Sequence, residues 1–273
     1  MDVAAYMRRI GYAGPQTPSA ETLRGLHLAH TMAIPFENLD IHLGRPISLE
    51  PSQLYDKVVG ARRGGYCFEL NGLFGWLLDS LGFAVDHLAA RVLLGDTIVR
   101  PRSHRVLLVT LSDQRWLADV GFGGNGLMAP IAVSPGQVDV QGMERFRLIQ
   151  IAEHEYRLEW GLDDRWQGLY RFGLEPQFPV DYIHANYFLS HSPDSIFTRT
   201  HICTKPTPEG RLVLQDRRFK VRAHGRTRVE TVEQVDNYRS ILEEQFGLYL
   251  SEDDLRTSFA GASAVASGSI HEW

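Results

Sequence analysis

Three scarcities narrow the classes to which this chain of 273 residues can belong. It has only two cysteines, far apart in the sequence, so neither a disulfide framework nor a CxxC metal cage can form. Its apolar runs fall far short of the ~20 residues that cross a bilayer, and its N-terminus lacks a basic-then-apolar signal pattern. With 28 basic and 33 acidic residues, the formal charge of −5 offers no basic footprint for nucleic acid. We therefore expect a cytoplasmic protein with no nucleic-acid or membrane partner.

The chain has enough hydrophobic residues to form a core, and the spacing of these residues changes along its length. Hydrophobic residues make up 44% of it, which is enough for a folded interior. Residues 1–82 have apolar positions three and four apart, which predicts helices, whereas residues 83–190 have β-branched and aromatic runs between turn residues, which predicts an antiparallel sheet or small barrel. Residues 191–273 mix short strands with a helix. Because helices precede strands instead of alternating with them, we expect an α+β protein of several domains.

Local signals place several element boundaries. Asp2 is a predicted N-cap for the first helix, and Thr17, followed by a proline, is the predicted start of the second. Residues 67–81 are apolar nearly all round, as in a buried helix. Thr231, with a glutamine three residues later, predicts a capping box for a late helix. Residues 261–268 are Ala, Ser and Gly with one Val, which predicts a loosely ordered tail.

The most informative stretch is RRGGYCFELN at residues 62–71, because two glycines allow a tight turn just before Cys67 opens the buried helix. A thiol at a helix N-terminus is placed at the positive end of the helix dipole, which stabilises the thiolate. The alternative is that Cys67 only fills space between helices, as most isolated cysteines do. The neighbouring residues must decide between the two.

A cysteine nucleophile needs an imidazole, and the imidazole needs an acceptor on its other nitrogen. His104 and Asp119 lie at the same end of a predicted hairpin. A two-residue turn at 113–114 would place Asp119 opposite Leu108, which is four residues, or about 13 Å, from His104. A simple hairpin therefore does not join them, and a longer turn, a bulge or a bend is required. The alternative is an ordinary polar pair at two strand ends.

Four segments together resemble one known family. They are RRGGYCFELN, SHRV at residues 103–106, DVGFG at residues 119–123 and IPFENL at residues 34–39. In order and approximate spacing they are similar to the motifs of the arylamine N-acetyltransferases, and the resemblance spans nearly the whole chain. It implies an N-terminal helical bundle over residues 1–82, an antiparallel β-barrel over 83–190, and a linker and α/β lid over 191–273. A cysteine-protease-like Cys-His-Asp arrangement comes with this fold.

The resemblance also implies the chemistry. It makes Cys67 the acetyl-accepting nucleophile, His104 the base and Asp119 the carboxylate that orients the base. The donor would be acetyl-CoA, and the acceptor an arylamine or arylhydrazine, in a ping-pong reaction through an acetyl-cysteine. A cysteine suits both halves, because one thioester forms easily from another and still reacts with an amine. Phe36 and Phe122 would line a shielded slot for the acceptor.

Contacts to CoA follow from the same resemblance. Ser103, Gly121 and Phe122 would touch CoA, and Phe197 would flank its adenine. The run at residues 121–126 also fits GxGxxG, the pattern of a dinucleotide site. We reject that interpretation, because prolines follow where the required helix would begin.

The remaining candidates are structural. An ion pair between Glu37 and Arg63 would tie the N-terminal helices to the loop before the reactive cysteine. His27 and His30 lie three residues apart on a helix and are expected to pack rather than bind a metal. Cys203 has only a nearby histidine in the sequence as a base, and we expect it to take no part.

Two other functions remain open from the residues alone. The order Cys, His, Asp also occurs in thiol hydrolases and transglutaminase-like proteins. A CoA-binding or aromatic-binding module without catalysis is the other alternative. The sequence does not give the oligomeric state, and a homodimer is compatible with it.

Overall fold

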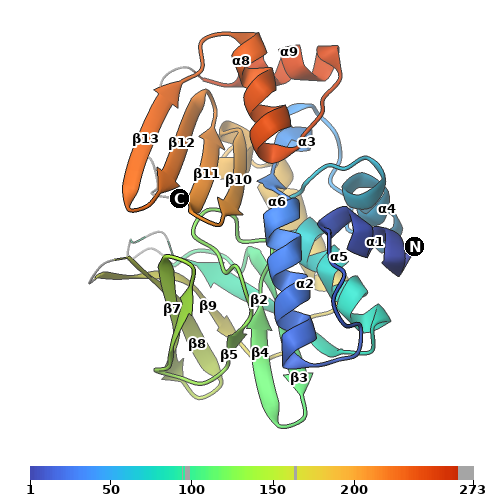
Figure 1. Ribbon diagram of the computed structural model, residues 1–273, viewed down its shortest axis with the longest axis vertical. Coiled ribbons are helices and arrows are strands. Elements are labelled where there is room, and N and C mark those ends of the chain that lie inside the picture. The colour runs from blue at the N-terminus through green and yellow to red at the C-terminus, as the bar shows by residue number, and fades with distance from the viewer. Residues whose placement is uncertain (94, 96–98, 163–164, 264–273) are drawn as a thin grey trace.

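The computed structural model describes residues 1–93, 95, 99–162 and 165–263. Its first part consists of helices packed around one buried helix (Figure 1). These are α1 (Val3–Ile10), α2 (Ala20–Ala33), α3 (Leu39–His42), α4 (Pro51–Tyr55), a π-helical turn (Asp56–Gly60) and α5 (Cys67–Ser80). The predicted helical bundle and the buried helix at its centre are confirmed.

Two of the predicted helix starts have different outcomes. The Asp2 side chain accepts a hydrogen bond from the backbone N–H of Ala4, so the predicted N-cap is confirmed. The start predicted at Thr17 is wrong, because Ser19 is the N-cap and its hydroxyl accepts from the N–H of Thr22. Serine is the more strongly preferred cap, and here it stands next to the first helical residue.

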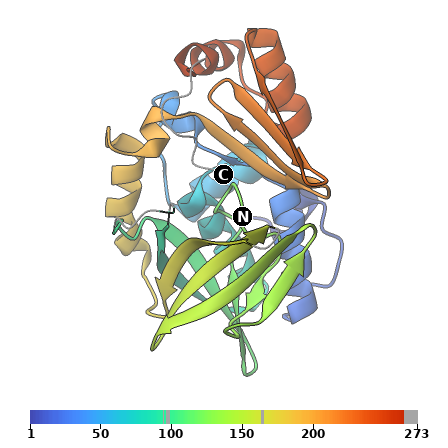
Figure 2. The same cartoon turned by 90° about the vertical axis from the view of Figure 1, so that its left-hand side faces the viewer.

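The central part is an eight-stranded antiparallel sheet in the order β5-β4-β3-β2-β9-β8-β7-β6. Only residues 133–137 separate its two edge strands in the chain, so the sheet curls into the predicted barrel (Figure 2). The strands are β2 (Ala84–Val92), β3 (His104–Leu111), β4 (Gln114–Ala118), β5 (Ile131–Ala132), β6 (Val138–Gln141), β7 (Glu144–Ala152), β8 (Glu155–Leu162) and β9 (Arg165–Gly173).

Strand β3 joins the barrel to the helices. Val106 and Leu108 belong to the hydrophobic cluster inside the barrel, whereas Leu107 and Val109 belong to the cluster around α5. Successive side chains of a strand point to opposite faces, so one uninterrupted apolar run can serve two cores. This arrangement brings the start of β3, at His104, close to α5.

The third part is a five-stranded sheet in the order β1-β10-β11-β12-β13, covered by late helices. Its first strand, β1, comes from the N-terminal region of the chain and pairs with β10. The elements are β1 (Phe36–Glu37), a 3₁₀ turn (Pro179–Asp181), α6 (Tyr182–His191), α7 (Ile196–Arg199), β10 (Ile202–Thr207), β11 (Gly210–Gln215), β12 (Arg218–Ala223), β13 (Arg226–Thr231), α8 (Val235–Ser240), a second π-helical turn (Ile241–Phe246) and α9 (Glu252–Gly261).

The predicted capping box at Thr231 is wrong. Thr231 ends β13 instead, and the residue that caps α8 is Gln234, whose side chain makes no capping hydrogen bond. Of the predicted tail at residues 261–268, Gly261 ends helix α9, and residues 264–268 lie outside the described residues.

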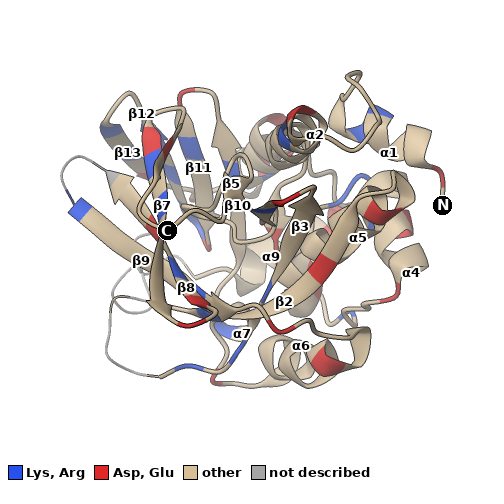
Figure 3. Ribbon diagram, turned by 90° about the horizontal axis from the view of Figure 1, so that it is seen from below, with Lys and Arg blue, Asp and Glu red and all other residues tan. Residues whose placement is uncertain are grey.

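A buried cluster of charges links the barrel to the second sheet. Glu144 of β7 forms ion pairs with Arg211 of β11 and Arg222 of β12. Arg211 also donates to the carbonyl oxygens of Gly124 and Gly126, and so holds the glycine-rich loop that follows β4. Figure 3 shows basic residues on these strands with acidic residues among them.

The described part of the chain contains neither a helix long and apolar enough to cross a membrane nor a group of three or more His, Cys, Asp or Glu side chains able to hold a metal ion.

Candidate active site

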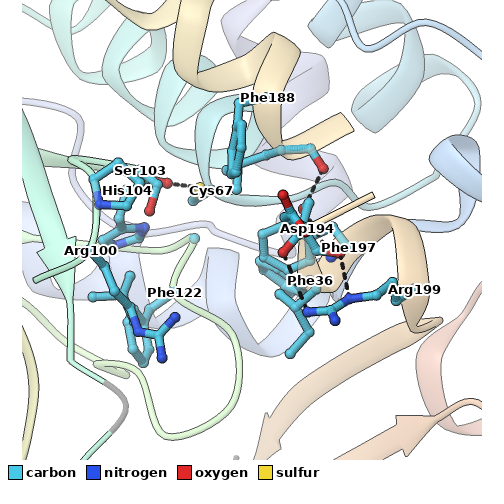
Figure 4. A pocket seen from close by; sticks show the side chains of 16 residues that line it. Phe36, Cys67, Arg100, Ser103, His104, Phe122, Phe188, Asp194, Phe197 and Arg199 are labelled. Carbon is cyan, nitrogen blue, oxygen red and sulfur yellow. Dashed lines mark hydrogen bonds between the residues drawn. The ribbon is translucent and has the colours of Figure 1, made fainter. Parts of the chain in front are cut away.

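A cavity of about 340 Å³ lies where the three parts meet (Figure 4). Its walls come from the start of α5, the barrel around β3, the loop after β4, strand β1, and helices α6 and α7. Every predicted site residue except Asp119 lines it: Phe36, Cys67, Ser103, His104, Gly121, Phe122 and Phe197. Predicted site residues separated by as many as 161 positions in the sequence therefore share one cavity.

Cys67 is the first residue of α5 and has a free thiol. Its side chain is buried in the fold but borders the cavity, and the thiol donates to the carbonyl oxygen of Ser103 at 3.7 Å. The preceding turn is fixed by Glu69, whose carboxylate accepts from the N–H of Tyr66 at 2.9 Å. The sulfur thus faces the cavity at the positive end of the helix dipole, where a thiolate is stabilised.

Buried charges hold the loop that leads into α5. The predicted ion pair is confirmed, with Arg63 Nε and a terminal nitrogen 2.9 and 2.8 Å from Glu37 Oε1. The same oxygen accepts from the N–H of Gly64 at 3.2 Å. Asp40 pairs with Arg63 at 3.0 Å and with Lys57 at 2.7 Å. Lys57 also bonds to Glu69 at 2.7 Å, so this network reaches the N-terminus of α5. Burial would lower the pKa of Lys57, but Glu69 and the other carboxylates outweigh burial and raise it.

The hairpin that carries the other two candidates has a different register from the one predicted. Leu111 pairs with Gln114, so the turn is at residues 112–113 instead of 113–114. Continuing this register places Asp119 opposite Val106 on the same sheet face as His104. Such diagonal neighbours are about 7–8 Å apart, within reach of long side chains. His104 Nε2 lies 2.7 Å from Asp119 Oδ2.

The surroundings of this pair set its charge. Burial alone lowers the pKa of His104, but the Asp119 carboxylate, helped by Cys67, outweighs burial and raises it to about 10. Burial would raise the pKa of Asp119, yet His104 together with the N–H groups of Asn71 and Gly121 lowers it. Both N–H groups donate to Asp119 Oδ1, at 2.8 and 3.0 Å. The arrangement therefore favours an imidazolium next to the cysteine sulfur.

Sequence reasoning missed Asn71, although it lies in the stretch that drew attention to Cys67. Its amide group donates to Asp119 and to the carbonyl of Arg105 at 2.6 Å, and its oxygen accepts from the N–H of Val120 at 2.9 Å. It lies on α5 one turn after Cys67, so one helix carries both the thiol and the support for the carboxylate. Residues four apart lie on the same face of a helix, so the spacing between Cys67 and Asn71 was the sequence signal that could have identified Asn71 as part of the site.

Aromatic rings form much of the cavity wall. The rings of Phe36 and Phe197 are 5.9 Å apart, and Phe122 meets His104 edge-on at 5.2 Å. Tyr170 of β9 lies 5.1 Å from the His104 ring and was not predicted. Phe188 of α6 also lines the cavity and was missed, because no helix was predicted there.

Gly121 has a steric role at this site. A Cβ there would lie 2.9 Å from the Cα of Cys67, so a glycine allows the loop after β4 to approach the start of α5. Strand β5, rather than a helix, is the next element after the glycine run at residues 121–126, which agrees with rejecting a dinucleotide site.

Known proteins share this sequence and fold over nearly its whole length. A family described as N-acetyltransferase matches residues 19–255. The arylamine N-acetyltransferase of Escherichia coli K12 is 38% identical over 257 residues, which are 93% of this chain and 90% of that protein. The chain belongs to the arylamine N-acetyltransferase family. It is thus an acyltransferase by membership, as the resemblance predicted.

Solved structures of this family have the same architecture. The arylamine N-acetyltransferase of Salmonella typhimurium has a TM-score of 0.89 and 37% identity, over 94% of this chain and 97% of that one. The enzyme of Mycobacterium marinum in complex with CoA has a TM-score of 0.89 and 33% identity, over 96% of this chain and 99% of that one. The predicted α+β fold of helical bundle, barrel and α/β lid is therefore confirmed.

Proposed function

We propose that this acyltransferase moves an acetyl group from acetyl-CoA to the nitrogen of an arylamine or arylhydrazine, through an acetyl-cysteine on Cys67. Its relatives are named for arylamine acetylation, and one is solved with CoA, which supports the donor and acceptor classes. The observation that carries the cysteine route is the contact chain from Cys67 through His104 to Asp119 at the cavity wall. A free thiol nucleophile also suits a reducing, cytoplasmic compartment.

In the first half-reaction the Cys67 thiolate attacks the thioester carbonyl of acetyl-CoA. The unpaired backbone N–H groups at the start of α5 stabilise the oxyanion that forms. When the intermediate collapses, the bond from the acetyl carbon to the CoA sulfur breaks. His104, as an imidazolium, gives its proton to the departing sulfur, which leaves CoA as a thiol and the imidazole neutral.

In the second half-reaction the amine nitrogen attacks the acetyl-cysteine carbonyl. Neutral His104 takes the proton that the nitrogen loses, and the Cys67 sulfur leaves as a thiolate. The product is the acetylated amine, and the thiolate–imidazolium pair is restored. Asp119 keeps the ring oriented through Nε2 in both steps, without changing its own protonation state.

The cavity fits the proposed acceptor class. Phe36, Phe122, Phe188 and Phe197 present aromatic surface to the cavity that the Cys67 sulfur borders. Such walls bind a flat ring and keep water from the acetyl-cysteine, which an amine must reach before water does. We propose Phe36 and Phe122 as acceptor contacts, and Ser103, Gly121, Phe122 and Phe197 as CoA contacts.

The release of CoA distinguishes this function from the two alternatives. With acetyl-CoA alone we expect one rapid turnover and then slow release, and with aniline added we expect fast continuous release. Equal rates with and without aniline would instead indicate a thiol hydrolase. Binding of acetyl-CoA without any release of CoA from it would indicate a binding module.

A further inference from the structure

A buried histidine outside the cavity contacts the backbone of Asp119. His27 of α2 is fully buried, and its Nε2 accepts a hydrogen bond from the backbone N–H of Asp119 at 3.1 Å. Its Nδ1 lies 3.0 Å from the carbonyl oxygen of Met128. Since an amide N–H can only donate and a carbonyl can only accept, these two partners require a neutral ring with its proton on Nδ1.

Asp119 begins the loop that connects β4 to β5, and Met128 lies near the end of that loop. Residues 119–128 follow β4, start at the carboxylate that bonds to His104, and include Gly121 and Phe122 of the cavity wall. One imidazole, 92 residues away from Asp119 in the sequence, therefore joins two points of this loop to α2. Thr31, one turn further along α2, donates to the carbonyl of Leu28 and lies 3.5 Å from the same Met128 oxygen.

We infer that His27 is a positioning residue for the acetyl transfer, which fixes the backbone of Asp119 so that its carboxylate meets His104. The inference rests on the proposed function, because it assigns His27 a part in that reaction. His27 touches no reacting atom and acts only through Asp119.

The opposite pKa shifts of His27 and His104 agree with a positioning role for His27 and a proton-transfer role for His104. Burial lowers the pKa of His27 to about 4, although the Met128 carbonyl and the Asp119 carboxylate both oppose the shift. The ring thus stays neutral near pH 7 and keeps its acceptor nitrogen for the Asp119 N–H. His104, on the side-chain face of the same aspartate, is shifted in the opposite direction.

His30 supplies a matched control. It lies on the same helix, is equally buried, and also packs edge-on against Phe74. Its Nδ1 bonds to the Tyr6 hydroxyl at 2.9 Å instead of to the loop. Replacing either histidine with phenylalanine thus removes one buried polar ring from one helix, but only His27→Phe frees Asp119.

The first test is the pH dependence of Cys67 alkylation by iodoacetamide, compared in the wild type, His27→Phe, His27→Gln and His30→Phe. We expect His27→Phe to raise the midpoint and to slow alkylation at neutral pH by about tenfold, because a buried donor loses its partner. His27→Gln offers an oxygen to the Asp119 N–H and should recover most of the rate. His30→Phe should keep the wild-type midpoint. Equal shifts in both phenylalanine variants, or none in His27→Phe, would overturn the inference.

A second measurement needs only the wild-type protein, so it holds even if a variant does not fold. Nitrogen NMR of the histidine rings should show His27 neutral, protonated on Nδ1 and unprotonated on Nε2 throughout the neutral pH range. A charged ring or the opposite tautomer would contradict the inference. If the wild type gains no acetyl group from acetyl-CoA, the proposed function fails, whereas both readouts here still test His27.

Discussion

The two cysteines of this protein are both buried, yet their surroundings differ completely. Cys67 begins helix α5, borders the cavity and contributes to the raised pKa of His104. Cys203 lies within β10, between β1 and β11, and burial together with Glu37 raises its pKa well above the ordinary thiol value. Exposure alone therefore does not distinguish a reactive thiol from an inert one. The helix terminus, the imidazole and the cavity do so.

Proximity in sequence is equally uninformative about the base. His201, two residues before Cys203, stacks on His42 with ring centroids 3.6 Å apart and lies 3.4 Å from Asp216. The partner of Cys67, by contrast, comes from another part of the fold, 37 residues further along the chain than the thiol. The comparison predicts that chemical differences between the cysteines will be large and will depend on His104.

The largest predicted effect is the loss of the nucleophile. We expect Cys67→Ala to lower acetyl transfer by at least about 10⁴-fold, because no other thiol borders the described cavity. Cys203→Ala should keep full transfer and cost about 1 kcal/mol of stability through lost packing. Amine acetylation assays and thermal unfolding of both variants check this. Full transfer by Cys67→Ala would remove the distinction between the two cysteines.

The next effect concerns the carboxylate that supports Cys67 through His104. In Asp119→Asn the amide oxygen should take the place of Oδ1, where Asn71 and Gly121 donate, and this leaves the NH₂ group facing His104 Nε2. The ring must then accept at Nε2 and keep its proton on Nδ1, so it cannot take one from the thiol. We expect a rate loss of about 10³–10⁴-fold with the fold retained. Kinetics with circular dichroism test this, and near-normal kinetics would contradict it.

The smallest effect is a shift in reactivity with pH. His104 holds its proton until the pH approaches about 10, and below that pH the imidazolium stabilises the Cys67 thiolate. Iodoacetamide should therefore modify Cys67 at neutral pH and leave Cys203 unmodified. Peptide mapping across pH measures both. In denaturant the two cysteines should react alike. Equal labelling of Cys67 and Cys203 in the native protein would contradict the predicted difference between them.

Much of this site could be predicted because its signals are local. Two glycines before a cysteine that opens an apolar helix are visible in the sequence, and helix α5 begins at that cysteine. The meeting of His104 and Asp119 was not predictable from spacing, since it depends on where the turn falls. Ser112 adopts a φ of +51° at that turn, a conformation that a serine does not signal.

Contacts between distant segments were beyond sequence reasoning. Although a sheet or barrel was expected over residues 83–190, no individual strand was predicted at residues 165–173, where β9 brings Tyr170 to the His104 ring. His27 was expected only to pack, because nothing in its own helix indicates that its partner is a backbone N–H far along the chain. The family resemblance predicted the fold. The contacts of Asn71 and His27 that hold Asp119 in place became visible only in the structure.

The most direct test is to mix the protein with acetyl-CoA, without any amine, and to locate the added mass. We expect intact-protein mass spectrometry to show a gain of one acetyl group, peptide mapping to place it on Cys67, and an added aromatic amine to remove it. An acetyl group on Cys203 or on an amine of the protein, or no gain at all, would contradict the account.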